Sequence, residues 1–163
     1  MLRAFAQATA PLRRRIAMMV ARGVVRRVDD ARKLQELQIA ALSGEIIGGA
    51  ERFQEYGLSS VPLEGAEVVV VFQGGTRSHP LVISVDDRPR RPRGQPAGDV
   101  AIYTDQDDPA ASAEDAEHRI QLTRDRAILA RAQTIDLRCG DTRILMDESG
   151  ITITTPRLDI VRA

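Results

Sequence analysis

The fold is decided by residues 120–163, IQLTRDRAILARAQTIDLRCGDTRILMDESGITITTPRLDIVRA. Apolar residues alternate here with Thr, Asp, Arg and Gln in short runs, and this period of two predicts half-buried β-strands. Turn-forming pairs such as Gly140-Asp141 and Ser149-Gly150 separate the runs. The inward positions of the six predicted strands are Ile120 and Leu122; Ile128, Ala130 and Ala132; Ile135, Leu137 and Cys139; Ile144 and Met146; Ile151 and Ile153; and Leu158 and Ile160.

Each predicted strand is too short to bury its own apolar face, and a single chain of such thin repeats would enclose little interior. Three copies wound around one axis would close the core, so the pattern predicts a trimeric fibre. An antiparallel meander that covers a neighbouring domain is the alternative. Which residues near 128 point inward is not decided by the pattern, because Ala127 and Leu129 compete with Ile128 and Ala130 for the inward face.

The composition fits a small assembly protein better than an enzyme. The chain has 163 residues, a formal net charge of zero, 28% charged residues and 3% aromatic residues. This length allows one domain or two small ones, and so few aromatic residues make a large core hard to build unless subunit interfaces supply burial. The lone Cys139 excludes an intrachain disulfide and is expected to act as a small buried hydrophobe.

No stretch is long and apolar enough to span a bilayer, and the N-terminus lacks the apolar run of a secretory signal. We therefore expect the protein to be made and assembled in a cytoplasm.

Residues 1–22 are predicted to form a basic, partly helical arm. Leu12, Ile16, Met19 and Val20 make a narrow apolar stripe beside the run Arg13–Arg15, and no acidic residue precedes Asp29. An arm that docks on a partner and a solvated terminus are both consistent with this pattern.

Residues 23–104 are predicted to form a compact β-domain. The apolar runs 68–72 and 81–85 read as two buried strands joined by a loop, and the proline-rich basic stretch 88–94 breaks regular structure before another strand at 100–103. Residues 33–42 are ambiguous between a helix, which propensity favours, and a strand. The acidic residues 105–118 are expected to form an exposed linker loop before the fibre of residues 119–163.

Several motifs in consistent order between Arg26 and Asp105 carry a resemblance to a known family. They are VDD at 28–30, LQELQ at 34–38, ERFQEYG at 51–57, PLEGAE at 62–67, FQGG at 72–75, VDDR at 85–88 and GDVAIY at 98–103. In these motifs the chain resembles the Mu-like bacteriophage baseplate central spike proteins, the baseplate assembly protein V family.

The resemblance implies an oligonucleotide/oligosaccharide-binding (OB) barrel in residues 23–104, which would place 33–42 in a barrel strand, followed by a triple-stranded β-helix in residues 119–163. It implies a homotrimer in the tail baseplate of the virion, attached to the baseplate hub protein through the OB domain. Sheath contraction would drive this spike through the bacterial outer membrane, so the implied role is mechanical.

Some spikes of this family close their tip with a His-x-His iron site. This chain has only His79 and His118, both upstream of the repeats, so we expect no apical iron and no other cofactor. A separate spike-tip protein or the Arg162 side chains would finish the tip.

No catalytic, cofactor-binding or metal-binding residue is predicted. Ser78 and His79 are adjacent, which does not make them a nucleophile and its base, and no third residue is marked to orient them. The linker 105–118 leaves no room for a cell-wall hydrolase domain. We therefore expect a protein that is not an enzyme.

A single-stranded nucleic-acid-binding OB protein is the best alternative function. Such a surface needs aromatic platforms in a basic groove, whereas Phe53, Tyr56, Phe72 and Tyr103 are few and Phe72 lies in an apolar run. We therefore expect no nucleic acid as a partner. The puncturing spike of type VI secretion shares the architecture, but a much larger chain is expected there.

Overall fold

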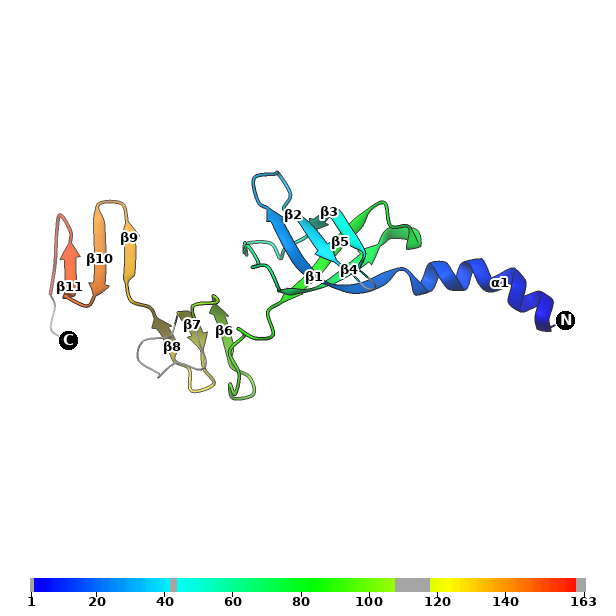
Figure 1. The fold of residues 1–163 in the computed structure, drawn as a ribbon. Helices are drawn as coiled ribbons and strands as arrows, with labels where there is room; N and C mark the ends of the chain where they lie inside the picture. The colour runs from blue at the N-terminus through cyan, green and yellow to red at the C-terminus, as the bar shows by residue number, and fades with distance from the viewer. Residues whose placement is uncertain (1, 42–43, 108–117, 161–163) are drawn as a thin grey trace. The chain divides into compact units, whose positions relative to one another are not determined.

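The computed structural model describes residues 2–41, 44–107 and 118–160, and they fall into two compact units divided between Pro89 and Arg90 (Figure 1). The elements in chain order are α1 (Leu2–Ala17), β1 (Val20–Asp29), β2 (Glu36–Ala40), β3 (Ile46–Arg52), β4 (Glu67–Phe72), the 3-10 turn η2 (Gln73–Gly75), β5 (Pro80–Asp86), β6 (Val100–Tyr103), β7 (Arg119–Leu122), β8 (Ile128–Arg131), β9 (Ile135–Cys139), β10 (Thr142–Asp147) and β11 (Gly150–Thr154). No described helix is long and apolar enough to cross a membrane.

The first unit contains a closed barrel with the strand order β1-β2-β3-β5-β4. Neighbouring strands are antiparallel except β3 and β5, which run parallel. The two strands predicted from the apolar runs are confirmed as β4 and β5, joined through η2, but β5 is buried only at Pro80 and Val82. A five-stranded barrel fits the expected OB-like fold.

The barrel interior is the hydrophobic core of the chain. In β4 every second residue points inward, so that Val68, Val70 and Phe72 are buried while the residues between them are partly exposed. The buried hydrophobic residues are Val25, Leu37, Ile39, Ile47, Ala50, Ala66, Val68, Val70, Phe72 and Val82.

The ambiguous segment 33–42 contains a strand, as the family resemblance implied and against helix propensity. Leu37 and Ile39 of β2 are both buried, and β2 pairs with β1 on one side and with β3 on the other. Tertiary pairing therefore decides the local structure here. Residue 42 lies outside the described residues.

The predicted arm is helical over α1, but its last residues belong to the barrel. Val20 pairs with Val71 and Arg22 pairs with Val69, so β1 begins inside the predicted arm. The link between α1 and the barrel is tight, because the Phe72 backbone N–H donates to the Met19 carbonyl at 2.8 Å.

Gly75 should be essential for seating α1 on the barrel. A Cβ at Gly75 would overlap the Arg15 backbone, with its carbonyl carbon at 3.0 Å, whereas a Cβ at Gly74 would meet nothing within 4 Å. Both glycines have positive φ, so Gly74→Ala carries the same kind of backbone strain without the clash. We expect trypsin to cleave at Arg13–Arg15 faster in Gly75→Ala than in Gly74→Ala. Equal cleavage rates would contradict this contact.

The second unit consists of two antiparallel three-stranded sheets, β6-β7-β8 and β11-β10-β9. β6, which we expected in the OB domain of residues 23–104, pairs with β7. The predicted strand at 158–160 is wrong, because these residues have no strand structure. They follow Pro156 and a turn in which the Thr155 hydroxyl donates to the Arg157 carbonyl at 2.8 Å.

Candidate functional site

Both sheets of the second unit carry one apolar face, and the strand register defines it. In the first sheet Leu122 pairs with Val100 and Ile128, and Ile120 pairs with Ile102 and Ala130. This register places Ile128 and Ala130 on the same face as Ile120 and Leu122. Leu129 pairs with Gln121 and points to the opposite face. In the second sheet the apolar face consists of Ile135, Leu137, Ile144, Met146, Ile151 and Ile153.

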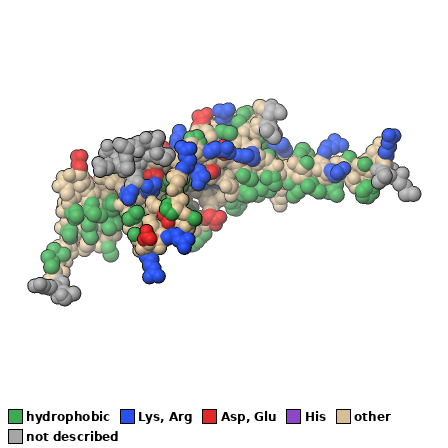
Figure 2. Space-filling model, turned by 90° about the horizontal axis from the view of Figure 1, so that it is seen from below, with side chains coloured by type: hydrophobic (Ala, Val, Ile, Leu, Met, Phe, Trp, Pro, Cys, Tyr) green, Lys and Arg blue, Asp and Glu red, His purple; other side chains and the backbone are tan. Residues whose placement is uncertain are grey.

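This apolar face is uncovered in the single chain. The buried hydrophobic core of the described residues lies between Val25 and Val82, and among described residues 90–107 and 118–160 no Val, Leu, Ile, Met, Phe or Tyr is buried. Figure 2 shows apolar side chains gathered over this unit on the side drawn there. Cys139 shares the face by register and is exposed in the single chain. A group of exposed apolar side chains of this kind marks an interaction site.

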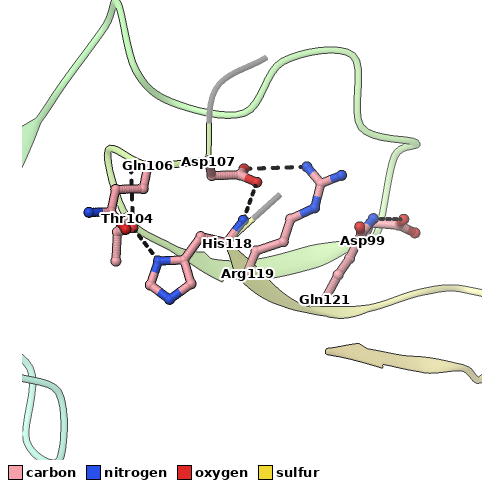
Figure 3. A network of polar contacts seen from close by, with 7 residues as sticks. All are labelled: Asp99, Thr104, Gln106, Asp107, His118, Arg119 and Gln121. Atoms are coloured by element: carbon pink, nitrogen blue, oxygen red, sulfur yellow. Dashed lines mark hydrogen bonds and ion pairs between the residues drawn. The ribbon is translucent and has the colours of Figure 1, made fainter. Parts of the chain in front are cut away.

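Polar contacts fasten the segment that follows β6 to the start of the neighbouring strand β7 (Figure 3). The Asp107 carboxylate accepts the His118 backbone N–H at 3.1 Å and lies 3.4 Å from the Arg119 guanidinium. Asp107 is buried, so our expectation of an exposed acidic loop is wrong at this residue. The pairing with Arg119 explains how a carboxylate is tolerated there. Residues 108–117 of the predicted linker lie outside the described residues.

Asp136 links two arginines on the other face of the second sheet. Arg138 and Arg143 lie directly opposite each other in β9 and β10, and like charges in this position repel. The Asp136 carboxylate accepts hydrogen bonds from Arg138 Nη2 at 2.7 Å and from Arg143 Nε at 2.8 Å. These bonds, the one from Arg138 first, lower the pKa of Asp136 from 3.8 to about 2.

Asp136 should make stability depend on pH at the acid end. Because its folded-state pKa lies below its usual value, the ionised carboxylate stabilises the fold above about pH 4, and this contribution is lost as the pH falls toward about 2. We expect Asp136→Asn to lower the thermal midpoint modestly at pH 7 and to match the wild type near pH 2, as measured by circular dichroism. A difference that stays constant over this pH range would contradict the assignment.

Each histidine side chain lies beside one hydroxyl group. His79 Nδ1 lies 3.1 Å from the Ser78 hydroxyl, and both side chains are exposed. His118 Nδ1 lies 2.6 Å from the Thr104 hydroxyl. Among the described residues, no three His, Cys, Asp or Glu side chains gather closely enough to hold a metal ion.

His118 and Asp136 line an open cavity of about 350 Å³ in the second unit, together with apolar residues that include Ile120 and Ala130. The Asp136 carboxylate in this cavity is already engaged by the two arginines. The cavity therefore adjoins the apolar face, and the Asp136 carboxylate in its lining is bound by arginines rather than by His118.

The aromatic residues of the barrel do not form a basic stacking surface. Phe72 is fully buried, whereas Phe53 and Tyr56 are exposed on either side of Glu55 along the chain. Carboxylates beside the exposed rings repel phosphate, which disfavours binding of single-stranded nucleic acid.

The family model described as "Bacteriophage Mu Gp45, N-terminal" matches residues 22–89, which contain nearly all of the barrel. A protein called "Mu-like prophage FluMu protein gp45" from Haemophilus influenzae is 38% identical over 150 residues, which cover 89% of this chain and 76% of that protein. This chain belongs to the Mu gp45 family of baseplate spike proteins. A second member of the Mu gp45 family, the "Baseplate puncturing device gp45" of Escherichia phage Mu, is 37% identical over 147 residues.

The alignment with the phage Mu protein covers 90% of this chain, so the similarity to the Mu gp45 family extends past the barrel into the second unit. The chain spans just under two thirds of the length of the phage Mu protein, since 66% of it is matched.

Proposed function

We propose that this protein is the central spike of a contractile phage tail or phage-like tail. In this role three chains form a homotrimer, the OB-type barrel attaches to the tail hub, and the second unit forms the shaft that punctures the host outer envelope when the sheath contracts. The protein would act in the tail baseplate of the virion, after assembly in the host cytoplasm. The role is mechanical and needs no cofactor and no catalytic residue.

The observation that carries this proposal is the uncovered apolar face of the second unit. Because the described residues of this unit form no buried apolar core, the unit gains burial when copies of the same face pack together. Three copies around one axis would also pair the free strand edges of each sheet with neighbouring chains, which suits a thin shaft under load. The printed name of the phage Mu relative, a baseplate puncturing device, supports the same role.

Tail particles that lack this protein provide the test. The full chain should restore both attachment at the tail tip and permeabilisation of the target cell, whereas a chain that ends at residue 118 should restore attachment without permeabilisation. Full permeabilisation by the truncated chain would contradict the proposed role of the shaft.

The N-terminal helix is proposed to strengthen attachment to the hub. Phe5, Leu12 and Ile16 are exposed on α1, and the helix carries arginines without any acidic residue. Removal of residues 1–17 should therefore reduce incorporation into particles, and normal incorporation would count against this role.

A further inference from the structure

The loop that joins β3 to β4 presents a second apolar surface, on the first unit. We call residues 53–63 the docking loop. Five large side chains of this loop are exposed: Phe53, Tyr56, Leu58, Val61 and Leu63. Tyr56 is fully exposed, and an apolar group of this size on a polar surface is typical of an interaction site.

Backbone hydrogen bonds attach the chain to the barrel at the start of the docking loop and just after its end. The Phe53 N–H donates to the Val82 carbonyl at 3.1 Å, and the Gly65 N–H donates to the Val25 carbonyl at 3.0 Å. Inside the loop the Leu58 N–H donates to the Glu55 carbonyl at 3.0 Å, closing a turn in which Gly57 has a φ of 85°. A turn with positive φ at its third residue favours glycine there and directs the second residue, Tyr56, outward.

A polar clamp holds the middle of the loop. The Ser60 carbonyl accepts hydrogen bonds from Arg52 Nη1 at 2.6 Å and from Gln35 Nε2 at 3.2 Å. Gln35 is only 5% exposed, and its side-chain oxygen Oε1 accepts a hydrogen bond from the same Arg52 Nη1 at 2.8 Å. On the other side, Gln54 Oε1 accepts the Ser60 backbone N–H at 2.7 Å. The apolar side chains are therefore presented by a preorganised loop, which reduces the entropy cost of binding.

The charges around the docking loop indicate the chemistry of its partner. Glu55 is exposed within the loop and Glu51 is exposed before it, while Glu64 lies 3.8 Å from Arg26. Residues 53–66 contain no Lys or Arg, and the adjoining Arg52 is engaged by Gln35 and Ser60. The complementary surface is an apolar pocket rimmed by Lys or Arg side chains.

We propose that the docking loop is the surface through which the barrel binds the tail hub protein, and that the hub offers an apolar pocket with a basic rim. This inference rests on the proposed function, because it assumes that the barrel attaches to the hub. It adds the residues that make the contact, with Tyr56 and Leu58 as the central anchors.

The test measures binding of the purified full-length protein to the purified hub protein of the same tail by titration calorimetry. The double variant Tyr56→Ser/Leu58→Ser should bind at least about tenfold more weakly, since a buried aromatic anchor contributes this much at protein interfaces. The matched control is Ile46→Ser, because Ile46 is 56% exposed and Leu58 is 58% exposed, and Ile46 lies outside the loop. The control should bind like the wild type.

Charge provides a second arm of the same test. Glu55→Lys should weaken hub binding and reduce its sensitivity to salt, because it places a cation against the basic rim.

The outcomes separate the two proposals. If the wild type binds the hub and the double variant binds it equally well, the docking loop is not the contact and only this inference fails. If the wild type does not bind the hub, attachment through the barrel fails together with it. If the double variant instead splits the oligomer, as seen by light scattering, the loop faces a second copy of this chain and the inference is overturned.

Discussion

Replacing Ile153 with Asp should convert the proposed trimer into monomers, whereas replacing its neighbour Thr152 with Asp should leave the proposed trimer intact. Both side chains are exposed in the single chain, so in a monomer the two substitutions would change the stability of the fold by similar small amounts. They point to opposite faces of β11, because Ile153 pairs with Ile144 while Thr152 pairs with Leu145. In a trimer each Ile153→Asp carboxylate would enter an apolar interface, which costs several kcal/mol for an unpaired ion.

Light scattering on the two variants measures the difference. A trimeric mass for both variants, or dissociation of both, would show that the apolar face does not hold the chains together.

Gly23→Ala should destabilise the barrel by about 1–3 kcal/mol, the usual cost of overpacking a well-filled core. A Cβ at Gly23 would overlap Ile39 Cγ2 and would lie 2.9 Å from the Ala40 carbonyl oxygen. Ile39 is fully buried and Ala40 is held in β2, so neither neighbour can withdraw cheaply. Gly23 therefore permits the close approach of β1 and β2 at the point where β1 passes from its pairing with β4 to its pairing with β2.

Gly48→Ala is the matched control for Gly23→Ala. A Cβ there would meet nothing within 4 Å, and its φ is not in the positive region. The control should be neutral, or should stabilise the protein by about 0.4–1 kcal/mol through the unfolded state. Urea unfolding followed by circular dichroism compares the two variants, and an equal loss of stability would refute the role of Gly23.

The sequence was sufficient to predict those elements whose signal is local. The apolar runs 68–72 and 81–85 and the loop between them became β4 and β5, and the alternation after residue 120 placed β7 to β11. The proline-rich stretch 88–94 contains the division between the two units.

Features that depend on distant partners could not be predicted in this way. β2 is a strand because β1 and β3 flank it, and the unit to which β6 belongs depends on its pairing with β7. Asp107 looked like a solvated residue in an acidic run, since its partner Arg119 lies twelve positions away. The clamp around Ser60 was missed for the same reason, because Gln35 and Arg52 approach it only in the folded barrel. A buried Gln has no local sequence signal that distinguishes it from an exposed one.

The mass of the purified full-length protein in solution, measured by light scattering at micromolar concentration, tests the proposed spike most directly. A trimeric spike predicts a mass of about three times 17.9 kDa, and a smaller assembly after removal of residues 120–163. A stable monomer of 17.9 kDa would contradict it, because the apolar face of the second unit would then remain uncovered in water.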